Sequence, residues 1–536
     1  MFEPSRALPP WVKKRDGRVV PFDPDAIGQD LFAAAEALGQ ADPFLTRELT
    51  DGVLHFLAAD CPDNIPGTEW IAELVVKVVR ELRQPRLAQA FAERGQAPEV
   101  VAVATAPSDT PAEVVRRSLE TYSLDAVFSR DLAAAHREGL LVLGGLAAPR
   151  ELTAAVLTPP EPSATLPALQ LLDAVLETRG GVAGWLALDG AEYIELEKGS
   201  PPLPRLLAPV LQAAGLTARL HLNVCDPPPW AVHAAQGPLF AEQIVGHKDA
   251  FHAAAAVVEA VLHLDRQHCP FAIDWHLSER DFAASADTNR GELLEAMVRA
   301  ALGDYPVTFV FNRPRRLMAL GPGLDRLHAC LLMTVGLNLT RLLEHTGISD
   351  DVELFLRKVA SLARLAVSAG VQKRQYLRGT LHETGGERSF LQRGFLLDRA
   401  RLLISPLGLD GAVRLLTGAG MHQGKTGLDL ARRVLQTLEQ VLEEEGKRRL
   451  VDCGLEITED LTGAKDMTPT GQQLTVVGRL HAVTGRGTVV AALGEDERLS
   501  VDHVVRLLEF AWRHTEVACL RFQPRPAVQQ QPTLLG

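Results

Sequence analysis

The 536-residue sequence lacks apolar runs long enough to cross a membrane. Its first residues, MFEPSRALPPWVKKRDG, contain no continuous apolar segment of the kind that secretory signal peptides need. Its longest apolar runs, such as HAAAAVVEAVLHL at residues 252–264, fall short of the ~20 residues of a transmembrane helix and predict buried helices. We therefore expect a cytoplasmic protein without membrane contact.

Closely spaced cysteines and excess positive charge are also absent. The six cysteines form no C-x-x-C pair, which excludes a zinc ribbon, a thioredoxin-like motif and a disulfide framework. We expect buried thiols and no metal site. The formal net charge of -12 argues against nonspecific nucleic-acid binding, because phosphate-driven binding needs a positive surface. The 46% hydrophobic content is enough for a large core.

One strongly basic stretch stands out in this acidic chain. WVKKRDGRVVPFDPDAI, residues 11–27, places Lys13, Lys14, Arg15 and Arg18 around an Asp16-Gly17 pair. Asp-Gly between apolar residues predicts a β-hairpin turn, and the clustered cations suit one polyphosphate. Taken alone, the cluster is more simply a solvated strand edge, since lysine on an edge discourages aggregation.

Helices are predicted after this hairpin. Asp23-Pro24 opens an amphipathic helix at residues 24–39, a second helix covers residues 44–59, and Thr68 is expected as the N-cap of a third at residues 69–83. An Ala- and Pro-rich stretch then predicts a linker at residues 96–116. We expect domains at residues 8–95 and 117–525, and a disordered tail at 526–536.

Strands and helices alternate through the larger domain. RLHLNVC (219–225), FAIDWHL (271–277), VTFVFN (307–312) and TVVAAL (488–493) are predicted strands separated by amphipathic helices. This alternation predicts α/β architecture with a buried sheet or barrel. RGGVAGW at residues 179–185 is expected to join two helices, and the charge run LEQVLEEEGKRRL at 438–450 to be a solvated helix face.

The first 95 residues resemble an ATP-cone, the nucleotide-sensing domain of many ribonucleotide reductases. The matching residues are Lys14-Arg15-Asp16-Gly17, Phe22-Asp23, Ile27, Thr68-Glu69-Trp70-Ile71 and Arg94. The resemblance implies that ATP or dATP binds to Lys13, Lys14, Arg15, Asp16, Gly17, Arg18, Val20, Phe22, Asp23, Ala26, Ile27, Thr68 and Arg94. Val20 and Phe22 are expected to form an apolar surface against the purine ring. The family carries Lys where Ala26 stands, and losing one charge-assisted contact costs about 1.5–3 kcal/mol.

The larger domain resembles the anaerobic (class III) ribonucleoside-triphosphate reductases, which are glycyl-radical enzymes. MTVGLNLTRL (333–342), CGLEITED (453–460) and LHAVTGRGTVVAAL (480–493) are similar to that family's strands and occur in its order. The resemblance implies a ten-stranded α/β barrel behind the small hairpin-plus-helices ATP-cone. AGMHQGKT at 419–426 fits a relaxed P-loop pattern, but we expect it in a helix–loop–helix connection.

The residues for the family's radical chemistry are missing from the matching stretches. The expected finger loop, FNRPRRLMALGPG at 311–323, has no cysteine, and the nearby Cys330 lies in a segment that reads as buried and apolar. No zinc site or glycyl-radical loop is expected after the last barrel strand. We therefore expect a catalytically inactive, nucleotide-binding regulatory paralogue, acting as a homodimer or on a genuine ribonucleotide reductase. The alternative is one subunit of a split reductase, whose radical-bearing segment is on another chain. A transcription repressor of the ATP-cone type would need a zinc ribbon.

Overall fold

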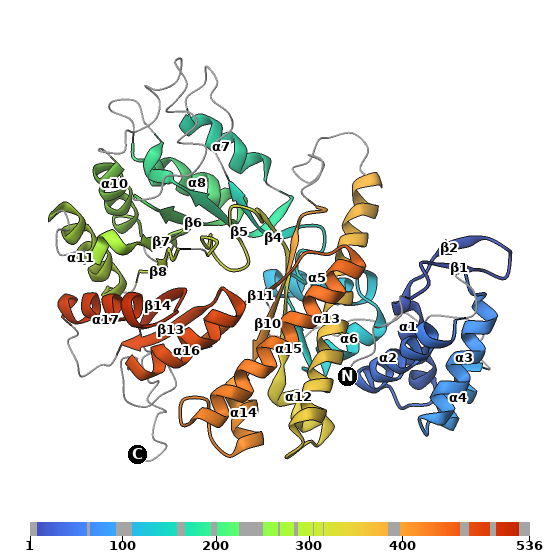
Figure 1. The fold of residues 1–536 in the computed structure, drawn as a ribbon. Helices are drawn as coiled ribbons and strands as arrows, with labels where there is room; N and C mark the ends of the chain where they lie inside the picture. The colour runs from blue at the N-terminus through green and yellow to red at the C-terminus, as the bar shows by residue number, and fades with distance from the viewer. Residues whose placement is uncertain are drawn as a thin grey trace, which may run out of the picture.

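The computed structural model places a small N-terminal domain (residues 8–92) against one side of a large α/β domain (residues 110–524), as Figure 1 shows. The residues that the structure describes are 8–61, 65–92, 110–157, 167–178, 180–194, 201–224, 250–265, 268–282, 288–303, 305–314, 316–383, 397–460, 471–493 and 500–524. Within them, no helix is long and apolar enough to span a bilayer.

The N-terminal domain is a two-stranded hairpin followed by four helices. The hairpin pairs β1 (Trp11–Lys13) with β2 (Val19–Pro21). The helices are α1 (Pro24–Ala37), α2 (Pro43–Asp60), α3 (Thr68–Glu81) and α4 (Pro85–Ala92). Asp23 caps α1 and Asp42 caps α2, each accepting backbone N–H groups and each followed by proline, so the sequence itself sets both starts. The predicted helix order is confirmed.

The large domain contains one twelve-stranded, mostly parallel sheet. Its strands are β3 (Leu141–Leu143), β4 (Leu152–Leu157), β5 (Val182–Asp189), β6 (Thr217–Leu222), β7 (Phe271–Leu277), β8 (Val307–Phe311), β9 (Cys330–Asn338), β10 (Arg401–Leu407), β11 (Cys453–Leu455), β12 (Thr458–Asp460), β13 (Thr488–Leu493) and β14 (Cys519–Pro524). The strand predictions at 219–225, 271–277, 307–312 and 488–493 are confirmed as β6, β7, β8 and β13.

The sheet consists of three sets of parallel strands, and two antiparallel pairs join them. Strands β4 to β8 run parallel to one another, β9 to β11 form a second parallel set, and β12 to β14 a third. Antiparallel pairs β4·β9 and β8·β14 join these sets. The two ends of the strand order, β11 and β12, are consecutive in the chain, and between them Glu456 N donates to Ile404 O of β10 while Ile457 O accepts from Thr488 N of β13.

Helices cover one face of this sheet. They are α5 (Pro111–Ala126), α6 (Arg130–Arg137), α7 (Pro167–Glu177), α8 (Leu203–Ala214), α10 (Ala250–Leu262), α11 (Thr288–Leu302), α12 (Leu339–Thr346), α13 (Val352–Glu383), α14 (Leu409–Thr417), α15 (Lys425–Arg449), α16 (Gly471–Thr484) and α17 (Val501–His514). Alternate strand residues such as Leu220, Ile273 and Phe309 share the main core with these helices. Residues 111–116, assigned to the linker on sequence, begin α5, where Thr110 and Glu113 form a capping box.

The opposite face of the sheet holds a small second core. Ala154, Ala187, Leu331 and Leu403 from four strands pack there with Leu320 and Leu324. Those two leucines belong to the segment 316–329 between β8 and β9, which overlaps the finger loop expected at residues 311–323 and shares Leu320 with it. Gly321 has φ +90° in this segment, and an added Cβ would lie 2.4 Å from the Trp185 ring, so only glycine allows the close approach.

Three sequence interpretations need correction. Residues 179–185 do not join two helices, because Val182 begins β5 and the segment leads from α7 into a strand. The charge run at 438–450 is not only a solvated face, because Glu445 is buried and the side chain of Arg449 is only 8% exposed. Gly67 rather than Thr68 is the N-cap of α3. The P-loop-like segment does lie between two helices, α14 and α15, as expected.

Candidate functional site

The basic hairpin closes with a wider turn than a two-residue Asp-Gly loop. Lys14 N donates to Arg18 O at 2.8 Å, Gly17 N donates to Lys14 O at 2.9 Å, and Gly17 has φ +86°. A turn followed by a residue with positive φ is a common form of longer hairpin loop. Glycine suits that position because it has no Cβ to clash at positive φ. The loop leaves Lys13, Lys14, Arg15 and Arg18 exposed to solvent.

Asp16 holds one of these cations within the loop. Its carboxylate accepts the Arg18 backbone N–H at 3.1 Å and the Arg18 Nε at 2.6 Å. These bonds from Arg18 lower the pKa of the Asp16 carboxyl. Asp16 therefore shapes the loop, and the charge of Lys14 also contributes to its lowered pKa, whereas Arg15 contacts Glu69.

The hairpin lies against the start of α3. Lys13 N donates to Pro66 O at 3.0 Å, and Lys13 forms a parallel bridge with Gly67. Arg15 Nε lies 3.4 Å from Glu69 Oε1, with the two side chains 80% and 73% exposed. Gly67 supplies no side-chain cap, so the first backbone N–H groups of α3 remain without a side-chain acceptor. The structure thus places the hairpin next to the start of α3, where Thr68 lies.

Other predicted residues serve the domain's packing. Val20 and Phe22 are half-buried against the N-terminal domain's core, and Ile27 belongs to that core. Asp23 caps α1, and its carboxyl pKa is raised by burial and by the neighbouring Asp25. Ala26 is exposed in the first turn of α1. Arg94 lies outside the described residues.

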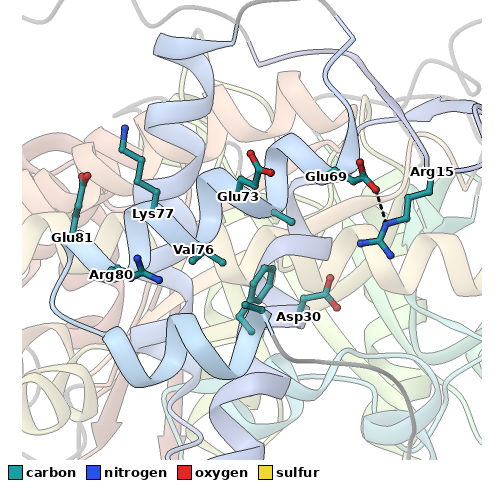
Figure 2. A pocket seen from close by; sticks show the side chains of 11 residues that line it. Arg15, Asp30, Glu69, Glu73, Val76, Lys77, Arg80 and Glu81 are labelled. Atoms are coloured by element: carbon teal, nitrogen blue, oxygen red, sulfur yellow. Dashed lines mark ion pairs between the residues drawn. The ribbon is translucent and has the colours of Figure 1, made fainter.

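A wide groove of about 1160 Å³ begins at Arg15 and runs along α3 and α4 (Figure 2). Ala72, Val76 and Phe91 provide an apolar wall. The charged side chains around it are mixed in sign: Arg15, Lys77 and Arg80 against Asp30, Glu69, Glu73 and Glu81. A flat apolar group fits this wall, whereas a polyphosphate is favoured only at the end where Arg15 meets the other hairpin cations.

Asp25, which the sequence analysis did not select, connects the two domains. It is 6% exposed at the start of α1 and forms ion pairs with Arg47 of α2 at 3.1 Å and with Arg449 of α15 at 2.5 Å. Its carboxylate also accepts the Ser368 hydroxyl of α13 at 2.9 Å. Burial alone would raise the pKa of Asp25, but Arg449 and Arg47 outweigh that effect and lower it.

Further ion pairs surround this contact. Asp51 of α2 pairs with Arg364 of α13 at 3.0 Å, and Lys358 of α13 pairs with Glu48 of α2. Phe44 of α2 packs in the main core of the large domain, edge-on to His345. The N-terminal domain is therefore docked through both apolar and charged contacts, with the Asp25 network at their buried centre.

The face of the sheet opposite the helices, called the inner face below, carries a row of polar residues that sequence reasoning also missed. Arg521 of β14, Thr308 of β8, Asp274 of β7, His221 of β6 and Asp189 of β5 are successive cross-strand neighbours. A sequence signal existed: polar side chains alternate with apolar ones in RLHL and IDWHL, and alternate residues share one face of a strand.

Ion pairs order this row. Arg219 binds Asp274 through Nε at 2.8 Å and Nη2 at 2.6 Å, while His221 Nε2 lies 3.1 Å from the same carboxylate. Burial lowers the pKa of His221 to about 3, so the imidazole is neutral at physiological pH. The Arg219 guanidinium, through its charge and its hydrogen bonds, keeps the pKa of Asp274 low despite its burial.

A cavity of about 130 Å³, called the interior cavity below, lies beside this row. Its lining includes Thr308, Glu456, Arg486, Thr488, Cys519 and Arg521. Ala319 and Gly321 of the 316–329 segment line it as well, so this segment brings no thiol to the cavity. Cys519 does, from β14, and burial raises the pKa of its thiol, which is therefore protonated.

Cys330 lies elsewhere. It is buried in the main core between the sheet and the helices, and burial raises the pKa of its thiol to about 12. This confirms the expected apolar setting of Cys330. Among the described residues, no three His, Cys, Asp or Glu side chains are grouped so that they could hold a metal ion.

Residues 10–94 match the ATP cone domain family. No curated protein sequence matches the chain. An anaerobic ribonucleotide reductase from Thermotoga maritima with glycerol in the active site is 13% identical, with a TM-score of 0.56, and covers 77% of this chain and 81% of that one.

Two further structures align over more of the chain. The Thermotoga maritima enzyme with dATP bound in the specificity site covers 93% of this chain and 91% of its own, at 12% identity and a TM-score of 0.54. Another anaerobic ribonucleotide reductase covers 93% of this chain and 88% of its own, at 12% identity and a TM-score of 0.53. The chain therefore contains an ATP cone domain at residues 10–94 and shares the fold of the anaerobic ribonucleotide reductases.

Proposed function

We propose that the N-terminal domain binds ATP or dATP between the hairpin and the groove of Figure 2. The observation that carries this proposal is the position of Arg15, which belongs to the hairpin cations and also lines the groove. Phosphates would contact Lys13, Lys14, Arg15 and the first turn of α3, where N–H groups and the helix dipole favour anions. The base would lie on Val76 and Phe91.

The residues present fit a nucleoside triphosphate, but less strongly than the family pattern. Ala26 supplies no cation, and four acidic side chains border the groove. The Arg15–Glu69 contact must also open or shift when phosphate approaches, because one guanidinium cannot serve both acceptors fully. We therefore expect binding that is weakened by acidic neighbours and sensitive to salt.

We further propose that the ligand state is passed to the large domain through Asp25. This residue follows Asp23-Pro24 directly, so a shift of the α1 start that accompanies ligand binding displaces the carboxylate held by Arg449 and Ser368. Those partners sit on α15 and α13, which pack on β9, β10 and β11. The signal would therefore pass through the direct contact of α1 with α13 and α15.

We infer that the large sheet closes as a barrel of ten strands. Residues 453–460 support this inference, because their first part pairs with β10 and their last part with β13, which makes β11 and β12 two ends of one bent strand. Counting that strand once, and leaving out β3, which only pairs with β9 outside the main strand order, gives five parallel strands on each side of the two antiparallel junctions. The 316–329 segment would then lie along the barrel interior.

We propose that the barrel serves regulation rather than radical chemistry. The 316–329 segment presents Ala319 and Gly321 to the interior cavity instead of a thiol. The second candidate function, a split reductase subunit, is favoured by one observation: Cys519 lines the same cavity from β14. A partner chain would then supply the radical, and Cys519 would be the thiol it reaches. The regulatory proposal places the target in a second copy of this chain or in a genuine reductase.

Calorimetry on the full chain tests the sensor. Wild type should bind ATP or dATP at one site, and Lys14→Ala combined with Arg15→Ala should abolish or greatly weaken binding. The matched control is Arg86→Ala combined with Arg479→Ala, two exposed arginines of α4 and α16 outside the groove, which should leave binding unchanged. Absence of binding by wild type would overturn the proposal.

Cys519→Ser separates the two candidate functions. Anaerobic ribonucleotide reduction is measured with this chain mixed with a glycyl-radical partner chain. The split-reductase alternative predicts activity that Cys519→Ser removes. The regulatory proposal predicts that wild type and Cys519→Ser have the same effect on the partner's own reduction rate.

A further inference from the structure

The interior cavity contains a guanidinium group whose charge is not compensated. Arg219 is satisfied by Asp274, and Arg486 pairs with Asp325 and donates to Leu324 O at 3.2 Å. Arg521 differs, because no carboxylate of the described residues forms an ion pair with it and its buried Nε has no hydrogen-bond partner. An unpaired, partly buried cation is costly, and the binding of an anion offsets that cost.

Asp274, the aspartate of the polar row, does not fill this role. Arg521 is the cross-strand neighbour of Thr308, and Thr308 is the neighbour of Asp274. Two strand spacings, roughly 10 Å of backbone, thus separate Arg521 from an aspartate that already binds Arg219 in two places. The charge of Arg521 remains directed at the cavity.

We propose that the interior cavity binds a small oxyanion, with Arg521 as its main cation and the hydroxyls of Thr308, Thr458 and Thr488 as hydrogen-bond donors. Threonine hydroxyls can donate to an anion and guanidinium forms paired hydrogen bonds with two oxygens. All three hydroxyl-bearing residues line the cavity. This site is separate from the nucleotide groove of the N-terminal domain.

The cavity volume limits the ligand. About 130 Å³ holds roughly four water molecules at their share of about 30 Å³ in the liquid. Phosphate, sulfate and acetate, with four or five non-hydrogen atoms, are of this size. Pockets for drug-sized molecules have about 300–1,000 Å³, so a nucleotide does not fit unless the 316–329 segment withdraws.

Glu456 makes the site sensitive to pH. Its carboxylate lines the cavity, accepts Gly323 N–H at 2.7 Å, and faces Arg219, Arg401 and Cys519 from the surrounding strands. Burial raises its pKa to about 7, opposed by that hydrogen bond and by the two arginines. A charged Glu456 repels an anion, so affinity should fall as the pH rises through 7.

Thermal unfolding of the full chain with added sulfate, phosphate or acetate tests the proposal. Sulfate is the best probe of the pH effect, because its own charge does not change between pH 6 and pH 8. A saturable rise in Tm that is larger at pH 6 is expected, since a ligand of the folded state stabilises by mass action. Sulfate also stabilises proteins generally, but that effect does not saturate.

Arg521→Gln should abolish the saturable rise in Tm. Arg506→Gln, which replaces an exposed arginine of α17, should retain it. Lys14→Ala combined with Arg15→Ala should also retain the saturable rise in Tm, which separates this site from nucleotide binding.

If Arg521→Gln does not fold, Glu456→Gln tests the proposal instead, because it should bind sulfate equally at pH 6 and pH 8. The proposal is overturned if wild type shows no saturable response to any of the three anions, or if the response persists in Arg521→Gln. It is also overturned if Glu456→Gln retains the pH dependence of wild type.

Discussion

Asp25 of the N-terminal domain and Arg449 of the large domain form a buried ion pair, with Oδ2 and Nη1 2.5 Å apart. The two side chains are 7% and 8% exposed, although 424 residues separate them in the chain. Arg47 and Ser368 complete the shell around the same carboxylate. Helix α1 of the N-terminal domain is thereby fixed to α13 and α15 of the large domain.

Removing the Asp25 charge should weaken domain docking. Asp25→Asn leaves Arg47 and Arg449 buried near each other without their shared carboxylate, and losing one partner of a buried pair costs about 3–5 kcal/mol. Urea unfolding should show a loss of that size or a new early transition of the N-terminal domain. Glu36→Gln is the control, because its pair with Arg130 is about half exposed and should contribute no more than ~1 kcal/mol. Equal stability of Asp25→Asn and wild type would contradict this assignment.

Docking should be lost in acid but not at neutral pH. The pKa of Asp25 is lowered in the folded protein, so its contribution is complete above the usual carboxyl value near 4 and disappears as the pH falls through the folded value. Limited proteolysis between pH 3 and pH 7 should detect release of the N-terminal domain only at the acidic end. In Asp25→Asn the same release should no longer depend on this titration.

Glu69→Gln should tighten nucleotide binding. The carboxylate competes with phosphate for Arg15, and the pair is exposed, so its loss frees the guanidinium at little cost to stability. A fewfold increase in affinity for ATP is expected, which is about 1 kcal/mol or less for an exposed pair. Glu81→Gln, at the opposite end of the groove, is the control in the same titration. A weaker affinity in Glu69→Gln would place the phosphates elsewhere.

Glu456 should make the protein less stable as the pH rises from 5 to 8. Its folded pKa of about 7 lies above the ordinary 4.5, so between these values the folded state retains a proton that the unfolded state releases. The full effect is roughly 3 kcal/mol at 1.36 kcal/mol per pH unit. Denaturant unfolding of Glu456→Gln should match wild type near pH 5 and exceed its stability near pH 8. A wild-type advantage at pH 8 would contradict the burial argument.

Helix starts and strands could be predicted from short stretches of the sequence. Asp23-Pro24 fixed the start of α1, and the strands at 271–277 and 488–493 were predicted with their observed bounds. The hairpin cations and the start of α3 were also expected to meet, because the order of their motifs matched a known domain. Gly67 was missed as the N-cap because Thr68 has the side chain that usually serves there.

Contacts between distant residues could not be predicted in this way. Asp25 looked like an ordinary acidic residue in a first helical turn, and Arg449 like part of a solvated charge run, because their burial arises only when two domains pack. Arg521 and Cys519 lie on the inner face only because β14 pairs with β8 and β13. The alternation of polar residues in β6 and β7 was the available sequence signal for that inner face.

Amide hydrogen exchange on the full chain, with and without ATP, tests the central claim most directly. The account predicts that ATP slows exchange in the hairpin and the start of α3, and also changes exchange in α13 around Ser368 and at the end of α15 around Arg449. In Asp25→Asn the change at the hairpin should remain, while the changes in α13 and α15 should disappear. Protection of the hairpin without any change in α13 or α15 of wild type would contradict transmission through Asp25, and no protection at the hairpin would contradict the nucleotide site itself.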